Sequence, residues 1–212
     1  MGSLRWPVLM PAVLGSLLLA LTPGPVLADP PGIPGPFSFF TGRNAVAAWT
    51  NETPAHDSRF SIKLATNAPT GQAYAGVWVN GVSGTKLSDI TALGFWVKGY
   101  TGGGAPRFSI VLDNGVVLYP SAFHCGAQSP ADWQKVDFVG GSCVIYDSAG
   151  HAHNGWGSVL YGQEGHANAT IQSLFLIVDE GPVVSYVDDI TVGILGKTVT
   201  FGEPGDNGLP NR

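Results

Sequence analysis

The 212-residue chain carries little charge, since only 12% of its residues are Asp, Glu, Lys or Arg, about half the usual ~25%. Ten basic residues stand against 15 acidic ones, so the sequence lacks the basic surface that phosphates require, which argues against nucleic-acid binding. The scarcity of Glu, Lys and Arg also argues against a long helical or coiled-coil protein. The 30 glycines have no period of three, which excludes collagen.

Long apolar runs are missing beyond the N-terminus. Residues 8–21 are apolar, Arg5 is the only charge before them, and helix breakers and a small-residue site ending at Ala28 follow. This pattern predicts a secretory signal peptide over residues 1–28, and therefore a secreted or periplasmic protein. The run is shorter than the ~20 apolar residues of a membrane span, so we expect none after cleavage.

Cysteine is scarce, with only Cys125 and Cys143 in the chain. In an exported protein an even count favours a disulfide bond between them. Two free buried thiols are the alternative interpretation. An oxidising compartment makes a catalytic cysteine a weaker reading than either.

The rest of the chain reads as one domain. Residues 29–36 form a Pro/Gly-rich leader, residues 37–195 the domain and residues 196–212 a polar tail. No 12-residue window has helical periodicity, whereas apolar and polar residues alternate in about nine short segments with turn residues between them. An all-β, two-sheet antiparallel β-sandwich is therefore predicted. The expected strands are 59–66, 73–79, 93–98, 107–113, 116–119, 133–139, 142–146, 171–178 and 183–194.

Three groups of segments resemble a known family. They are 58–64 with 87–99, then 132–138 with Gly155-Trp156-Gly157, then 171–179 with 186–192. In this order and spacing they resemble the jelly-roll carbohydrate-binding modules of the galactose-binding-domain-like superfamily, over roughly residues 37–194. The resemblance implies a jelly roll, often with a structural calcium ion and without catalysis. It leaves the ligand open, because this fold binds many things besides sugar.

The resemblance places a calcium ligand at Asp188. If the last strand alternates without a bulge, Asp188 shares the core face with Tyr186 and Ile190, where a carboxylate is costly unless it is paired or bound to a metal. Asp57, in the loop before the strand at 59–66, is the second predicted ligand. Alternatively, backbone amides at a β-bulge satisfy Asp188. The segment 37–42 lacks the acid that the family often has there.

Aromatic side chains are the predicted ligand contacts. A flat ring covers the apolar C–H face of a sugar while polar groups pair with its hydroxyls. The alternative is packing between the sheets. The candidates are Trp78, Trp96, Tyr119, Trp156 and Tyr161, with Tyr100 as a further one.

Residues 147–168 form the most unusual segment, rich in Gly, Ala, His and Asn. An irregular stretch of this length is uncommon and often functional, so we expect ligand contact here before any other loop. His151 and His153 stand two apart and could share a metal, with His166 further on. A closed zinc site needs four ligands, and the sequence shows no reliable fourth, so a hydrated polar surface is the favoured interpretation.

Signs of catalysis are weak. After residue 28 the chain has four glutamates, none in a closely spaced acidic pair on one strand face as glycosidases require, and it has no nucleophile elbow. The leading hypothesis is a non-catalytic module that binds polysaccharide or glycan. The second is an extracellular protein-interaction or structural sandwich, which a flat surface without an aromatic row would favour. The third is a small secreted hydrolase, which needs His151, His153 and an acid within bonding distance.

Overall fold

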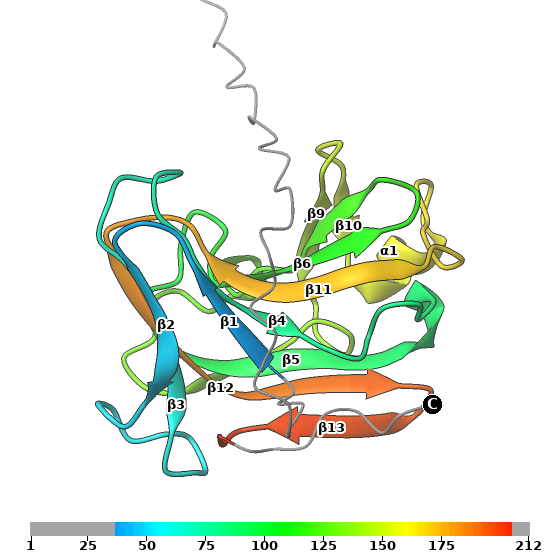
Figure 1. Cartoon of the computed structure of the whole chain (residues 1–212). Helices are drawn as coiled ribbons and strands as arrows, with labels where there is room; N and C mark the ends of the chain where they lie inside the picture. Colours follow the sequence, from blue (N-terminus) through cyan, green and yellow to red (C-terminus); the bar gives the residue numbers. More distant parts are fainter. Residues whose placement is uncertain (1–36, 205–212) are drawn as a thin grey trace, which may run out of the picture. The chain divides into compact units, whose positions relative to one another are not determined.

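A computed structural model describes residues 37–204 of the chain. The predicted signal peptide (1–28) and leader (29–36) lie outside these residues. Within 37–204, none of the helices has the length and apolarity needed to cross a membrane. The described chain is built almost entirely of antiparallel strands, which form two sheets that face each other as layers (Figure 1). The predicted all-β sandwich of jelly-roll type is confirmed.

The larger sheet has seven strands and the smaller has six. The connections between strands include a short helix, α1 (Trp156–Tyr161), and two 3-10 turns, η1 (Leu87–Asp89) and η2 (Phe123–Cys125). In spatial order the seven-stranded sheet is β1 (Phe37–Thr41), β4 (Ala75–Val79), β11 (Ile171–Val178), β6 (Arg107–Leu112), β7 (Val117–Tyr119), β9 (Val144–Asp147) and β10 (Ala152–Asn154). The six-stranded sheet is β2 (Ala45–Thr50), β3 (Ser61–Thr66), β12 (Val183–Ile194), β5 (Ile90–Gly99) and β8 (Gln134–Asp137), with β13 (Lys197–Phe201) also paired to β12.

The core lies between the two sheets, where every second residue of each strand points inward. Phe95 of the six-stranded sheet meets Phe108 of the seven-stranded sheet with ring centroids 5.4 Å apart, and Phe138 lies 5.7 Å from Phe108. All three are almost completely buried. Each ring buried in this way contributes about 1.5–3 kcal/mol, so this trio holds the layers together.

Four strands lie where none was predicted. β1 and β2 have runs of phenylalanine and alanine in place of a clear alternation, which hid them from the period-two criterion. β10 and α1 fall inside the segment 147–168, so the prediction of an irregular stretch there was wrong. β13 lies in the predicted tail, and the domain therefore extends past residue 195. It forms because the second half of β12 offers it an open edge, from Ile190 to Ile194.

A β-bulge divides β12 at Asp188 and Asp189. The first half of the strand pairs with β3 and the second half with β13, and the register with β5 shifts at the same point. Asp189 has a left-handed φ of 47°. Val187 and Ile190 both face the core and are fully buried. Of the two interpretations left open for Asp188, uninterrupted alternation is therefore not observed and the β-bulge is, because two residues occupy one step of the ladder.

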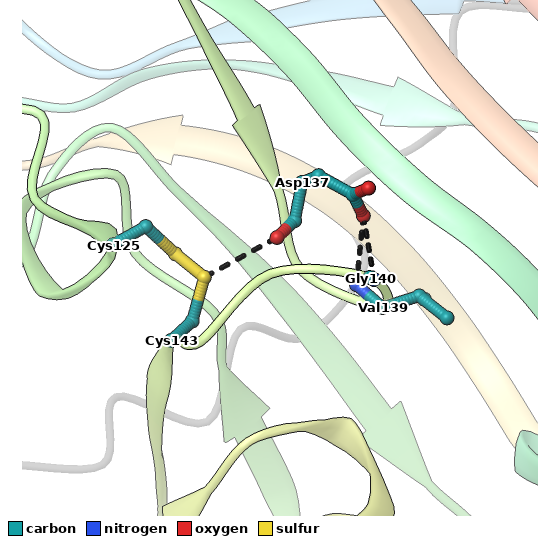
Figure 2. The surroundings of a disulfide bond; sticks show 5 residues. All are labelled: Cys125, Asp137, Val139, Gly140 and Cys143. Atoms are coloured by element: carbon teal, nitrogen blue, oxygen red, sulfur yellow. Dashed lines mark hydrogen bonds between the residues drawn. A yellow bond between two sulfur atoms is a disulfide. The ribbon is translucent and has the colours of Figure 1, made fainter.

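Cys125 and Cys143 form a disulfide bond, as predicted (Figure 2). Cys125 ends η2 and Cys143 lies just before β9. The Sγ of Cys143 is 3.4 Å from the carbonyl oxygen of Asp137. The Asp137 carboxylate also accepts the N–H groups of Val139 (3.1 Å) and Gly140 (2.8 Å). The disulfide thus fixes η2 to the turn that joins β8 to β9.

Candidate functional site

The outer face of the seven-stranded sheet carries a group of rings. Directly opposed residues on neighbouring strands share one face of a sheet, and the register pairs Trp78 with Phe175 and Tyr119 with Tyr146. The same register pairs Phe40 with Gly76, two residues along β4 from Trp78. We call these five aromatic residues the aromatic face: Phe40, Trp78, Phe175, Tyr119 and Tyr146.

Three rings of the aromatic face, those of Phe40, Trp78 and Phe175, pack against one another while staying partly accessible. Trp78 lies 4.6 Å from Phe175 and 5.1 Å from Phe40, centroid to centroid. Tyr146 is 38% exposed. A Cβ at Gly76 would meet the Phe40 ring at 2.3 Å, so only glycine lets that ring lie over β4. The result is a group of three adjoining rings on strands that are distant in sequence, with Tyr119 and Tyr146 further along the same face beyond β6.

A charged group borders the aromatic face. The guanidinium carbon of Arg107 is 5.6 Å from the Tyr119 ring centroid, and two of its nitrogens donate hydrogen bonds of 2.7 and 2.6 Å to Asp179. Burial, together with the charge of Asp179, raises the pKa of Glu180 to about 7, although Arg107 opposes this shift. Within residues 37–204, Glu180 Oε2 is buried and has no hydrogen-bond partner.

Only two of the five predicted ligand residues, Trp78 and Tyr119, lie on the aromatic face, with β11 and β6 between their strands. Trp96 faces outward as expected, but from the six-stranded sheet, where its ring is stacked on His56 at 3.5 Å. Trp156 is only 4% exposed, so its prediction as a ligand contact was wrong because helix α1 turns the indole into the core. Tyr161 is 74% exposed at the end of α1.

Three residues of the aromatic face were not predicted: Phe40, Phe175 and Tyr146. Phe175 and Tyr146 occupy outward positions of predicted strands, so the alternation marked them as outward-facing. What the sequence could not give is the strand order that sets them beside Trp78 and Tyr119. Tyr100 does not join them, since it lies directly after β5 of the other sheet.

A surface hollow lies beside Tyr161. Its volume is about 560 Å³. It combines one exposed ring with amide and carboxylate groups, the mixture that a sugar requires. Part of the segment 147–168 therefore borders a concave surface, and ligand contact there stays a prediction. The residues lining it include Ser88, Asp113, Asn114, Tyr161, His166 and Asn168.

Histidines of the same segment surround a buried carboxylate that was not among the predicted ligands. Asp147 Oδ2 is 2.9 Å from His151 Nδ1 and 3.3 Å from His153 Nε2. Burial alone would raise the pKa of Asp147, but hydrogen bonds from the backbone and ring of His151 and from the ring of His153 lower it to about 2. The condition set for the hydrolase hypothesis, two histidines and an acid within bonding distance, is met.

The two predicted calcium ligands, Asp188 and Asp57, both contact His56 beside the β12 bulge. Each carboxylate oxygen of Asp188 accepts a backbone N–H, from His56 at 2.7 Å and from Asp189 at 2.9 Å. Burial raises the pKa of Asp188 to about 6. The exposed Asp57 and the partly buried Asp189 lie 3.1 and 2.9 Å from His56 Nδ1. Calcium takes six to eight oxygen ligands, so the imidazole at the centre fits it poorly, and calcium here stays a prediction.

No family model matches the chain, and no curated protein matches it. Among solved structures, it is similar to a family 11 carbohydrate-binding module of a cellulosomal cellulase from Clostridium thermocellum, at 14% identity over 84% of this chain and 93% of that one, with a TM-score of 0.43. It is also similar to a family 30 carbohydrate-binding module, at 13% identity over 76% of this chain and 93% of that one, with a TM-score of 0.47. A third similar structure is the enzymatically active domain of bacteriophage CBA120 tailspike protein 4, at 15% identity over 75% of this chain and 19% of that one, with a TM-score of 0.35. These are similarities of chain path, so function has to be inferred from the side chains.

Proposed function

We propose that this chain is a secreted, non-catalytic module that binds a polysaccharide or glycan on its aromatic face. The observation that supports this most is the contact between Trp78, Phe175 and Phe40 on an outward sheet surface. Large hydrophobic rings in a β-sandwich normally face the core, whereas these three lie on the outside of a sheet. Adjoining outward rings suit the apolar faces of successive sugar units, and they give the ligand a direction across the strands.

Polar groups beside the rings complete such a site. Arg107 has five N–H donors, and its bidentate pair with Asp179 holds the guanidinium in place next to Tyr119. Sugar hydroxyls both donate and accept, so a fixed guanidinium and carboxylate can pair with them without rearranging. The disulfide and the signal-like N-terminus support secretion, because disulfides persist in oxidising compartments.

A protein partner is the alternative reading of the same sandwich. A flat surface without an aromatic row would have favoured it. Because Trp78 and Phe175 are cross-strand neighbours and Tyr119 and Tyr146 are too, the outer face has the rings that the glycan hypothesis requires. The rings on the outer face therefore favour a glycan over a protein as the partner.

The test is retention of the purified full chain on insoluble cellulose, chitin, xylan and β-glucan, with and without EDTA. We expect retention on one polymer, and Trp78→Ala to weaken it tenfold or more, as loss of a central aromatic anchor typically does. Trp96→Ala, on the other sheet, is the matched control and should bind as the wild type does. Loss of retention in EDTA would tie binding to a metal.

Two outcomes would contradict the proposal. If none of the four polymers retains the chain, the protein-partner reading takes its place. If Trp78→Ala binds as tightly as the wild type while Trp96→Ala does not, the ligand lies on the six-stranded sheet. Circular dichroism of both variants separates lost binding from lost folding.

The hydrolase hypothesis has one observation in its favour, the grouping of His151, His153 and Asp147. A hydrolytic metal needs an open coordination position that substrate and water can reach. The side chains of Asp147 and His153 are 1% and 4% exposed, and only His151, at 50%, reaches solvent. This arrangement suits a ligand cage better than a reaction site.

A further inference from the structure

Three imidazoles from neighbouring parts of the chain converge on one carboxylate oxygen, that of Asp147. Asp147 ends β9, His153 lies in β10, and His166 follows α1. Asp147 Oδ1 accepts the backbone N–H groups of Ala149 and His151, both at 2.9 Å. Its other oxygen, Oδ2, is left to face three imidazoles, at 2.9 Å (His151 Nδ1), 3.3 Å (His153 Nε2) and 4.0 Å (His166 Nε2).

His166 shows that this arrangement is incomplete as it stands. Its side chain is only 10% exposed, and Nε2, which points at Asp147 Oδ2, is buried without a hydrogen-bond partner among the described residues. A separation of 4.0 Å is too long for a hydrogen bond. A buried polar atom normally has a partner, so the unpaired Nε2 of His166 points to a ligand held between these side chains.

We infer that Asp147, His153 and His166 bind a divalent transition metal of the zinc type, with His151 as the fourth ligand. The three ligand atoms of the first set lie within 4.8 Å of one another. Zinc–ligand bonds of about 2.0–2.1 Å place tetrahedral donors about 3.3 Å apart. The distance between Asp147 and His153 has this value, and His166 needs only a small closing movement. His151 Nδ1 already lies 2.9 Å from Asp147 Oδ2, and its half-exposed side chain would exchange this hydrogen bond for the ion.

The chemistry of the donors selects the metal. Three imidazole nitrogens and one carboxylate suit zinc, and also nickel or copper, whereas calcium and magnesium require mainly oxygen. The backbone amides on Oδ1 orient the Asp147 carboxylate, as outer-shell hydrogen bonds do around metal ligands. Four protein ligands close the site, so its role is structural, to fasten the β9–β10 hairpin to the segment after α1.

The experiment titrates the EDTA-treated full chain with ZnCl2 in a calorimeter and follows its thermal unfolding. We expect one zinc ion per chain, a higher Tm with zinc, and no such rise with CaCl2. His166→Gln should weaken zinc binding at least 100-fold. Since this ring makes no hydrogen bond in the described structure, the variant should fold. Co2+ in place of zinc should give the visible absorption of a four-coordinate site.

His124→Gln is the matched control, because His124 also has a buried ring nitrogen without a partner in the described part of the chain but lies outside the cluster. It should bind zinc as the wild type does. His56→Gln tests the other group of possible ligands, His56 with Asp57 and Asp189. The inference is overturned if the wild type binds less than one equivalent. It is equally overturned if His166→Gln and His153→Gln bind zinc as tightly as the wild type.

Discussion

The outer faces of the two sheets follow the same alternation but present different side chains. On the seven-stranded sheet, Trp78 and Phe175 are ring neighbours across strands. On the six-stranded sheet, Lys63 pairs with the exposed Glu52 at 2.5 Å, and His56 covers the ring of Trp96. Both faces look outward, yet among residues 37–204 adjoining apolar rings lie on the outer face of the seven-stranded sheet alone. Alternation therefore determines which residues face out, while strand order determines whether they form one surface.

The contrast extends to one carboxylate on each side of the molecule. Glu180, just after β11, is almost buried, and burial raises its pKa to about 7. Glu52, on the six-stranded sheet, is exposed, and its hydrogen bond to Lys63 lowers its pKa. The carboxyl group of a glutamate is thus shielded from water beside the aromatic face and solvated on the side of the six-stranded sheet.

The largest predicted effect follows from Glu180. Below its ordinary pKa of 4.5 the group is protonated in both folded and unfolded chains. Between pH 4.5 and 7 the unfolded chain ionises first, so the free energy of unfolding falls as the pH rises, by an amount on the order of 3 kcal/mol. Glu180→Gln should remove this loss and be more stable than the wild type at pH 8, as urea unfolding across pH 4–9 would show.

Glu52→Gln is the matched control for that series. Because the Glu52 side chain is exposed and its ion pair is screened by solvent, this variant should follow the wild-type pH profile. An identical slope for Glu180→Gln and the wild type would contradict the assignment of the pH dependence to the buried carboxyl.

The second prediction uses a glycine on each outer face. A Cβ at Gly76 would lie 2.3 Å from the Phe40 ring, and a Cβ at Gly94 would lie 2.3 Å from the carbonyl oxygen of Val136. Overpacking of this kind costs about 1–3 kcal/mol, so both alanine variants should lose stability in thermal unfolding. Only Gly76→Ala displaces a ring of the aromatic face, so only this variant should bind glycan severalfold more weakly. If Gly76→Ala and Gly94→Ala bind glycan equally well, Phe40 is not part of the ligand site.

The sequence predicted the sandwich because most strands alternate clearly, as in 59–66 and 171–178. It also predicted the disulfide, since export and two cysteines leave few other choices. At β12 it left two interpretations open, and the alternative is the one observed: a bulge at Asp188 and Asp189 where backbone amides satisfy the carboxylate. Local sequence could not decide between the two, because the bulge lies where β12 passes from pairing with β3 to pairing with β13.

The candidate sites were less predictable for a related reason. Trp78 and Tyr119 were named from composition and parity, but their neighbours Phe175 and Tyr146 come from strands far along the chain. Asp147 was overlooked because its importance depends on the β9–β10 hairpin and helix α1, which fold His153 and His166 onto it. Long-range pairing thus supplies what local sequence lacks, both for the rings and for the imidazoles.

The smallest effect is expected at the margin of the aromatic face. Tyr146 is 38% exposed, and its ring lies 4.9 Å from that of His124, so a bound glycan would cover only part of it. Tyr146→Ala should weaken binding about fivefold, or ~1 kcal/mol. Tyr146→Phe should restore most of this if the ring face makes the contact. Tyr186→Ala, on the six-stranded sheet, should leave binding on the same polymer unchanged, and a loss as large as that of Tyr146→Ala would remove the distinction between the two faces.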